Sequence, residues 1–425
     1  MGKFIDVILA FCYIFGFSLN GGGKLDSNMA VAVFLFLYAI CNISYMKTLV
    51  SFFSKSYSQG IIKYYLIINL WIMIVLLVNL QTDYSYMITF LHMFFVVIVG
   101  AMLCLYYTKK GRLNNVVNYI VIAFIVQSLI EWAGFLSPSF SALIQTTKNE
   151  YAIKKILEYS GVRGNALCGS DFFGLSAAFA LVYVVFLSSK NSLFASNRIL
   201  KLCVFFLLLT GTFFAGRTGY VGLVIVIYHV IKNRRQVFSK TKLNFQEIFS
   251  CIMVVGSLLS LITYFIYLYN TDDNFNWLFR WTFQNLFNYA ETGSFQSSST
   301  AHLTNDMYFE INPLTFFFGD GLYTMPDGSY YMNTDSGYMR PILYMGVVGF
   351  LLMIAMMFSM LKVRKGNEKN LKISILLILF ILNYKGEVVM WNMVQLSVFS
   401  LYCFQDYLMM FHLKKVKYNV VHNIS

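Results

Sequence analysis

The sequence predicts an all-α, polytopic membrane protein with about 12 transmembrane helices, because its apolar runs are long enough to cross a bilayer. Composition is the first observation behind this prediction. Hydrophobic residues make up 58% of the 425 positions and charged residues 12%, far from the balance of soluble domains. The second observation is that the net charge of +13 recurs as short basic clusters between apolar runs. That distribution indicates membrane topology and argues against a nucleic-acid partner.

The predicted spans follow one another along the whole chain. The apolar runs cover residues 4–19, 29–46, 64–80, 86–107, 113–136, 169–188, 199–215, 218–231, 248–269, 337–361, 371–384 and 388–413. Asp6 interrupts the first run and no small-residue cleavage site follows it, so we interpret this run as an uncleaved span. We expect one integral membrane domain, 1–425.

The basic clusters predict the orientation. With the N-terminus inside, most of the 32 lysines and arginines fall in inner segments, as the positive-inside rule requires. Both termini are then cytoplasmic, and the long connections 137–168 and 270–336 lie outside. Within 270–336, Trp277, Leu278 and Trp281 recur near helical spacing. This spacing predicts amphipathic helices that either lie at the membrane interface or pack on the helix bundle.

Arg217 stands out because it interrupts the apolar stretch 199–231. As one helix this stretch would be about 50 Å long, against roughly 30 Å of hydrocarbon. Both of its flanks are basic and therefore favour the cytoplasm, so the stretch must cross twice. Arg217 is then placed at the outer turn, where it could hold an anion. The alternative is an arginine that only snorkels from a helix end.

No pattern in the sequence calls for a metal or a cofactor. The seven cysteines are scattered without ligand or disulfide spacing. No P-loop or Rossmann glycine pattern occurs, and no DxD pair faces the cytoplasm. The predicted outer face instead gathers arginines and carboxylates, a set that suits a lipid pyrophosphate, since guanidinium groups bind phosphate oxygens bidentately.

Three outer segments resemble a known family. They are GVRGNALCGSDFFGLSAAFAL (161–181), FFAGRTGYVGLVIVI (213–227) and INPLTFFFGDGLYTMPDGSYYMNTDSGYMRPILYMGVVGFLL (311–352). These segments look like the Wzy-type O-antigen polymerases and their relatives, the WaaL-type O-antigen ligases. Arg163 and Gly174 match the family's Arg-x(10)-Gly spacing. Residues 216–219 are similar to its [ST]-[GR]-R-[TGS] turn, and 318–321 with 334–338 to its G-x-G … H/D-N/S-x-Y stretch.

Two positions depart from the family pattern. The family's Arg-x(15)-Gly spacing is not met at Arg280, because Gln296 stands where the glycine is expected. The ligases carry histidine where this chain has Asp335, which favours a polymerase over a ligase. A repeat-unit flippase is a third possibility, although its charges should line the spans of two similar halves.

The resemblance implies a GT-C-like enzyme of the bacterial inner membrane that works without metal or cofactor. Its donor would be an undecaprenyl-pyrophosphate-linked glycan, and its acceptor a sugar hydroxyl of a second lipid-linked repeat unit. The transfer would occur at the periplasmic face, with membrane lipid around the protein. A Wzz-type chain-length regulator and the flippase would be possible partners.

The same resemblance suggests roles for individual residues. Arg217, with Arg163 and Arg280, would stabilise the pyrophosphate leaving group. Asp335 would be the base that accepts the acceptor's proton, with Glu387 and Asp320 as alternatives, or would instead cap the following helix. The remaining candidates for substrate binding are His302, Tyr323, Tyr338, Arg340 and Glu387.

Overall fold

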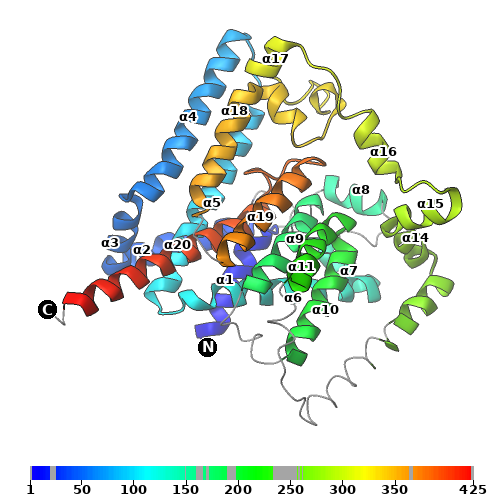
Figure 1. Ribbon diagram of the computed structural model, residues 1–425, viewed down its shortest axis with the longest axis horizontal. Helices are drawn as coiled ribbons and strands as arrows, with labels where there is room; N and C mark the ends of the chain where they lie inside the picture. Colours follow the sequence, from blue (N-terminus) through cyan, green and yellow to red (C-terminus); the bar gives the residue numbers. More distant parts are fainter. Residues whose placement is uncertain are drawn as a thin grey trace. The chain divides into compact units, whose positions relative to one another are not determined.

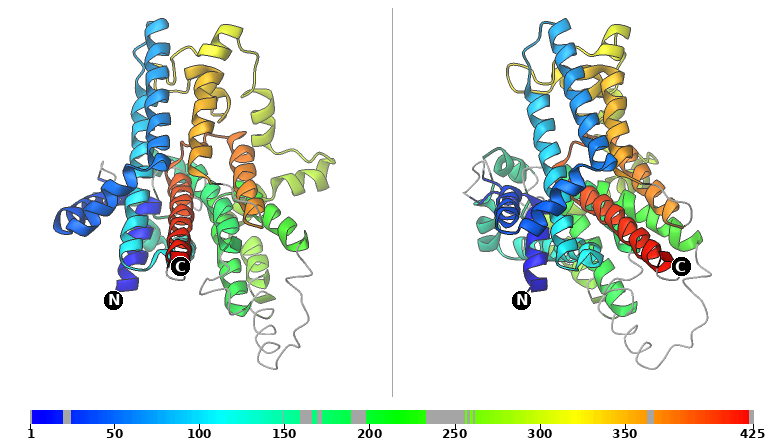
Figure 2. Two further views of the ribbon diagram at one scale, coloured as in Figure 1. Left: turned by 60° about the vertical axis from the view of Figure 1, so that its left-hand side comes forward. Right: turned by 90° about the vertical axis from the view of Figure 1, so that its left-hand side faces the viewer.

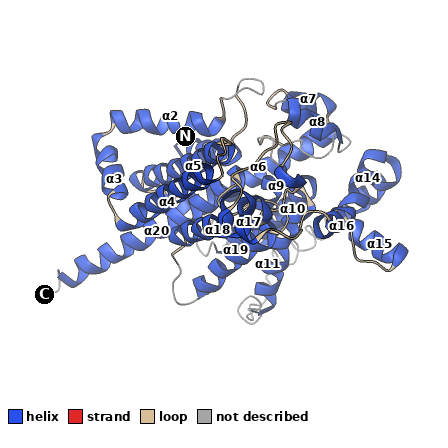
Figure 3. Ribbon diagram, turned by 90° about the horizontal axis from the view of Figure 1, so that it is seen from above, coloured by secondary structure: helices blue, strands red, loops and turns tan. Residues whose placement is uncertain are grey.

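The computed structural model describes residues 2–19, 25–148, 150–158, 166–168, 172–188, 198–232, 256, 259–260, 262–362 and 367–422. In these ranges the regular secondary structure is helical, apart from the isolated bridges Ser18–Asp26 and Thr324–Tyr330 (Figure 3). The chain divides into two compact units. Unit 1 comprises residues 1–16, 27–116 and 298–425, and unit 2 comprises 17–26 and 117–297.

The helices of both units are labelled in Figure 1. Those of unit 1 are α1 (Gly2–Phe15), α2 (Ser27–Cys41), α3 (Ile43–Phe53), α4 (Ser56–Val78), α5 (Ser85–Lys109), η1 (Leu113–Asn115), α16 (Ser298–Asn305), α17 (Pro313–Phe318), η3 (Tyr331–Asn333), α18 (Met339–Met360), α19 (Asn367–Asn383) and α20 (Met393–His422). Those of unit 2 are α6 (Val116–Leu136), α7 (Pro138–Gln145), α8 (Glu150–Glu158), α9 (Phe172–Ser188), α10 (Arg198–Ala215), η2 (Arg217–Gly219), α11 (Tyr220–Lys232), α14 (Asp273–Thr282) and α15 (Gln284–Thr292).

Four helical segments of the described chain have the length and apolarity of a complete membrane crossing. They are Ser56–Val78, Ser85–Lys109, Leu113–Leu136 and Met339–Met360, and the pair α2 and α3 becomes a fifth if it is counted as one bent span. This supports an all-α membrane protein, but it does not support the predicted number of about 12 crossings. The run 248–269 lies partly outside the described residues.

The predicted number is too high because several apolar runs break into shorter helices. Between α2 and α3 the chain turns by 112°. The Asn42 side chain accepts a hydrogen bond from the Tyr45 N–H (3.0 Å) and so caps α3 at this point. In unit 2, α9, α10 and α11 hold apolar segments shorter than a crossing. Hydrophobicity alone does not reveal these breaks, because a polar cap or a glycine changes the mean of a run very little.

Unit 1 is built around α4, α5 and α18, which lie side by side (Figure 2). α4 and α18 are antiparallel, because Trp71 Nε1 donates to the Met345 carbonyl (2.7 Å) and the Tyr57 hydroxyl donates to the Met360 carbonyl (2.7 Å). α5 follows α4 after the connection 79–84. The C-terminus of α4 and the N-termini of α5 and α18 therefore lie at the same end of unit 1.

The two ends of these helices differ in charge. Lys55, Lys109 and Lys362 lie at one end. The carboxylates Asp83, Asp320, Asp335 and Glu387 lie near the other, which we call the acidic end. This separation agrees with the predicted sidedness, and the side of the membrane that each end faces stays a prediction.

A break in α18 shapes the acidic end. Gly346 has φ +69° and ψ 173° inside the helix. Before the break, the Leu343 carbonyl accepts a hydrogen bond from the Asp320 N–H (2.6 Å). A Cβ at Gly346 would lie 2.1 Å from the Phe317 carbonyl oxygen, so only glycine permits this close approach. The break therefore docks residues 313–321 onto α18 and fixes the loop that follows them.

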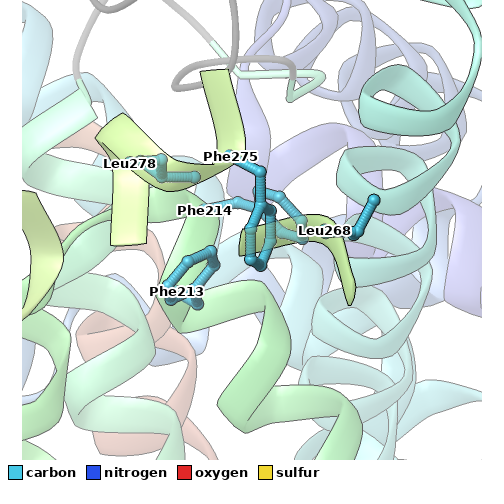
Figure 4. Close-up of a cluster of buried hydrophobic side chains, with 5 residues drawn as sticks. All are labelled: Phe213, Phe214, Leu268, Phe275 and Leu278. Atoms are coloured by element: carbon cyan, nitrogen blue, oxygen red, sulfur yellow. The ribbon is translucent and has the colours of Figure 1, made fainter. Parts of the chain in front are cut away.

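Unit 2 has an aromatic core that α14 helps to build. Phe213 and Phe214 of α10 pack with Leu268, Phe275 and Leu278 (Figure 4). Leu278 and Phe275 are fully buried. Of the two alternatives for this amphipathic segment, α14 therefore takes the one that packs on other helices.

Candidate functional site

The residues predicted to form a site divide between the two units. Unit 1 holds His302, Tyr323, Asp335, Tyr338, Arg340 and Glu387, and unit 2 holds Arg217 and Arg280. Arg163 lies outside the described residues. The direct contacts between predicted residues are those of Tyr323, Arg340 and Glu387 at the acidic end of unit 1.

A buried ion pair forms the centre of this group. Arg340 Nη1 lies 2.8 Å from Glu387 Oε2, and both side chains are more than nine-tenths buried. The Tyr323 hydroxyl donates to the same carboxylate oxygen at 2.6 Å. Burial raises the pKa of the Glu387 carboxyl, while Arg340 and the Tyr323 hydroxyl act in the opposite direction. Burial and the neighbouring carboxylate also raise the pKa of Tyr323, so its hydroxyl stays protonated and remains a donor.

Aromatic rings enclose the Arg340 guanidinium. Its Cζ lies 3.7 Å from the centroid of the Tyr323 ring and 3.9 Å from that of Tyr330. Tyr323 contacts Trp391 edge-on at 5.6 Å, and Trp391 in turn stacks on Tyr86 at 4.0 Å. Tyr323 is buried, whereas Tyr330 is 42% exposed. The guanidinium is thus held between an inner ring and a ring at the surface, an arrangement that favours cation–π attraction.

Asn383 holds the connection that carries Glu387. Its side-chain oxygen accepts hydrogen bonds from the N–H groups of Val388 (2.9 Å) and Val389 (3.1 Å), and its amide donates to the Gly337 carbonyl (2.7 Å). A Cβ at Gly337 would lie 2.3 Å from the Gly386 carbonyl oxygen. The start of α18 and the segment after α19 therefore touch backbone to backbone, which places Glu387 beside Arg340.

Asp83, which the sequence reasoning did not select, fixes the loop that carries Tyr323. Its Oδ2 accepts hydrogen bonds from the N–H groups of Tyr323 (2.7 Å) and Thr324 (3.0 Å), and its Oδ1 accepts one from the Ser85 N–H (3.0 Å). Burial acts to raise the pKa of Asp83, but these hydrogen bonds outweigh it and lower the pKa overall. The available signal was its place in the predicted outer connection between two spans.

Asp335 lies at the surface next to this cluster. The surrounding protein desolvates the carboxyl and raises its pKa, while the cations of Lys385, Arg340 and His302 oppose that shift. Asp335 also acts on the pKa of Glu387. The alternative role as helix cap is wrong, because the Ser336 hydroxyl accepts from the N–H groups at the start of α18, from Tyr338 at 3.3 Å among them.

Three other predicted residues have structural contacts of their own. His302 Nδ1 lies 2.5 Å from Asp306 Oδ2 within α16. The Tyr338 hydroxyl donates to the Phe380 carbonyl (2.8 Å), so this ring joins α18 to α19. Asp320 accepts hydrogen bonds from the hydroxyls of Thr315 and Tyr331 (2.7 and 3.1 Å). Asp320 therefore closes the turn after α17, and this occupies both of its oxygens.

Arg217 occupies the predicted break in its apolar stretch. α10 ends at Ala215, and Gly216 (φ +146°) leads into η2, which begins with Arg217. Arg217 Nη1 donates to the Trp281 carbonyl (3.2 Å), and its Cζ lies 4.8 Å from the Trp281 ring centroid. The interruption is confirmed, and within unit 2 the guanidinium ties η2 to α14.

Arg280 lies on α14 with 54% of its side chain exposed. Its Nε donates to the Tyr269 hydroxyl at 3.1 Å, and its Nη1 lies 3.8 Å from Glu291 Oε1. An exposed pair at this distance contributes little to stability. Arg280 is therefore accessible to an anion from solvent, as its predicted role requires.

Comparisons of the chain with family models, with curated proteins and with solved structures find no match. The resemblance to the O-antigen polymerases therefore stays a prediction. Among the described residues, no group of three or more His, Cys, Asp or Glu side chains is arranged to hold a metal ion.

Proposed function

We propose that the chain is a membrane glycosyltransferase that polymerises undecaprenyl-pyrophosphate-linked repeat units at the periplasmic face of the inner membrane. One observation supports this most strongly. Asp335 and Glu387 come together with the Arg340 guanidinium and two tyrosine rings at the end of apolar helices. Ends of membrane helices lie at the level where the head group of a lipid-linked substrate meets water.

The proposed chemistry needs a base for the acceptor hydroxyl. In this proposal Asp335 takes that proton, because it is exposed to an incoming substrate and its raised pKa brings it closer to the working pH. Glu387 is less suited to this step, since Arg340 and Tyr323 already occupy one of its oxygens.

The leaving pyrophosphate needs cations, because negative charge builds on its bridging oxygen. Arg217, with Arg163 and Arg280, is proposed for this role. A guanidinium matches phosphate oxygens bidentately, which a lysine cannot do. No metal takes part in the proposed transfer.

A gene deletion in the source strain tests the proposal, with lipopolysaccharide separated on gels. A single repeat unit on the lipid A-core is the expected result. Loss of all O-antigen would indicate the ligase or the flippase instead, and an unchanged ladder would overturn the proposal.

Complementation then tests the base. Asp335→Asn should reduce polymer synthesis by about 10²–10⁴-fold, the usual contribution of a general base. Glu310→Gln is the matched control, since it removes an exposed carboxylate of unit 1 outside the site. Wild-type polymer from an Asp335→Asn variant at matched membrane abundance would exclude this role.

A further inference from the structure

Two polar atoms of the Arg340–Glu387 pair have no hydrogen-bond partner. Arg340 Nε and Glu387 Oε1 are both buried, and neither finds a partner in the part of the chain that the structure describes. Buried polar atoms are nearly always hydrogen-bonded, and charged ones are the most costly to leave unpaired. The unpaired atoms belong to the two side chains that share the 2.8 Å bond, so one small group could reach both.

The chemistry of these atoms restricts what that group can be. Arg340 Nε–H can only donate a hydrogen bond, and ionised Glu387 Oε1 can only accept one. A phosphate oxygen would satisfy the arginine but would be repelled by the carboxylate. An ammonium group would satisfy the carboxylate but would be repelled by the guanidinium. A hydroxyl both donates and accepts, so it complements the two atoms together.

We propose that Arg340 and Glu387, between the rings of Tyr323 and Tyr330, form a binding site for a neutral saccharide. One sugar hydroxyl bridges Arg340 Nε and Glu387 Oε1. This assignment rests on the proposed function, in which the saccharide is the acceptor sugar, and it assigns the pyrophosphate to other residues.

The surroundings fit a sugar. Tyr323, Tyr330, Trp391 and Tyr86 contribute flat apolar faces around few polar groups, which is the usual composition of a small-molecule site. Tyr330 is the exposed member, so a ligand enters from its side.

The loop geometry allows that entry. Tyr330 lies on a turn in which the Met325 N–H donates to the Ser329 carbonyl (2.9 Å). Asp83 anchors this loop farther back, at Tyr323 and Thr324. The Tyr330 ring can therefore move aside while the inner wall of the site stays fixed.

Saturation-transfer NMR on the purified full chain in detergent tests this site without requiring polymerisation. The probes are the methyl glycosides of glucose, galactose, rhamnose and N-acetylglucosamine, and inorganic pyrophosphate as competitor. At least one glycoside should receive saturation from the wild type and from the Glu310→Gln control. Binding to Glu387→Gln should be weaker by about tenfold or more, because the bridging hydroxyl loses an ionised acceptor.

A second variant keeps the test valid if Glu387→Gln unfolds. Tyr330→Ala changes a surface ring, leaves the ion pair intact and should also weaken glycoside binding. Pyrophosphate should leave the saturation transfer unchanged. Equal binding to wild type and to both variants, displacement by pyrophosphate, or no glycoside binding to the folded wild type would each overturn the saccharide site.

The outcome is separable from that of the proposed function. Glycoside binding through Glu387, combined with a normal polymer ladder after gene deletion, would retain the saccharide site and reject the polymerase. A lost ladder without glycoside binding would retain the polymerase and reject this site.

Discussion

Glu387→Ala should strongly destabilise unit 1. The substitution removes the acceptor of the Arg340 bond (2.8 Å) and of the Tyr323 bond (2.6 Å). It also leaves a guanidinium that is more than nine-tenths buried without its counter-ion. Breaking a buried pair in this way costs about 3–5 kcal/mol. For a unit of this size, that free energy corresponds to a fall in melting temperature of roughly 6–20 °C.

A paired substitution separates the lost charge balance from lost packing. Arg340→Met with Glu387→Met removes both charges and fills much of the same space. Apolar replacement of a whole buried pair is often neutral or stabilising. The double variant should therefore melt well above Glu387→Ala, although it removes more polar contacts.

The chain's own cysteines provide the assay. Cys104 and Cys403 are 0% and 2% exposed and belong to unit 1, so a thiol-reactive fluorescent dye reaches them only when unit 1 opens. The background replaces the other cysteines by serine, at positions 12, 41, 168, 203 and 251. A Glu387→Ala variant that melts with the wild type, or a double variant no more stable than Glu387→Ala, would refute the reasoning.

Four further predictions test other parts of the structure. Gly346→Ala should cost about 1–3 kcal/mol, because its Cβ meets backbone at a strained φ, whereas Gly60→Ala, with open space around it, should be harmless; equal melting of the two in the dye assay would contradict this. Asp83→Asn should cost about 1.5–3 kcal/mol at neutral pH. The deficit should shrink as pH falls below 3.8, because the lowered folded-state pKa of Asp83 makes its stabilisation disappear there; a deficit independent of pH would exclude this. Arg217→Ala should abolish polymer and Arg217→Lys restore it partly at equal membrane abundance, whereas full activity in the alanine variant would leave the arginine a structural role only. Polymer synthesis should decline as pH falls through a pKa above the ordinary 3.8 of Asp335, since the base must be ionised; an acid limb unchanged in Asp335→Asn would contradict this.

Fold class was predictable from the sequence because the membrane imposes long apolar helices. Composition and run length predict an all-α membrane protein, and the structure agrees. The number of crossings was not predictable in the same way. Gly346 bends a helix inside an apolar run, and Asn42 ends one, through backbone geometry and side-chain capping. Such local events barely affect hydropathy.

Site residues were predictable where charge stands out against an apolar background. Arg217, Arg340 and Glu387 were found in this way. Asp83 and Tyr330 were missed, because their importance depends on contacts between segments far apart in the sequence. Asp83 reaches Tyr323 across 240 positions, and in a chain with 30 tyrosines nothing local distinguishes Tyr330.

The most direct test of whether the Arg340–Glu387 pair serves substrate binding rather than folding is the activity of the double variant Arg340→Met, Glu387→Met. Polymer is measured in a deletion strain complemented with this variant, at wild-type membrane abundance and with its melting temperature determined. We predict a folded protein that makes no long polymer, because it has no charged pair to hold the acceptor hydroxyl. Normal polymer from the folded double variant would show that the pair serves only the structure.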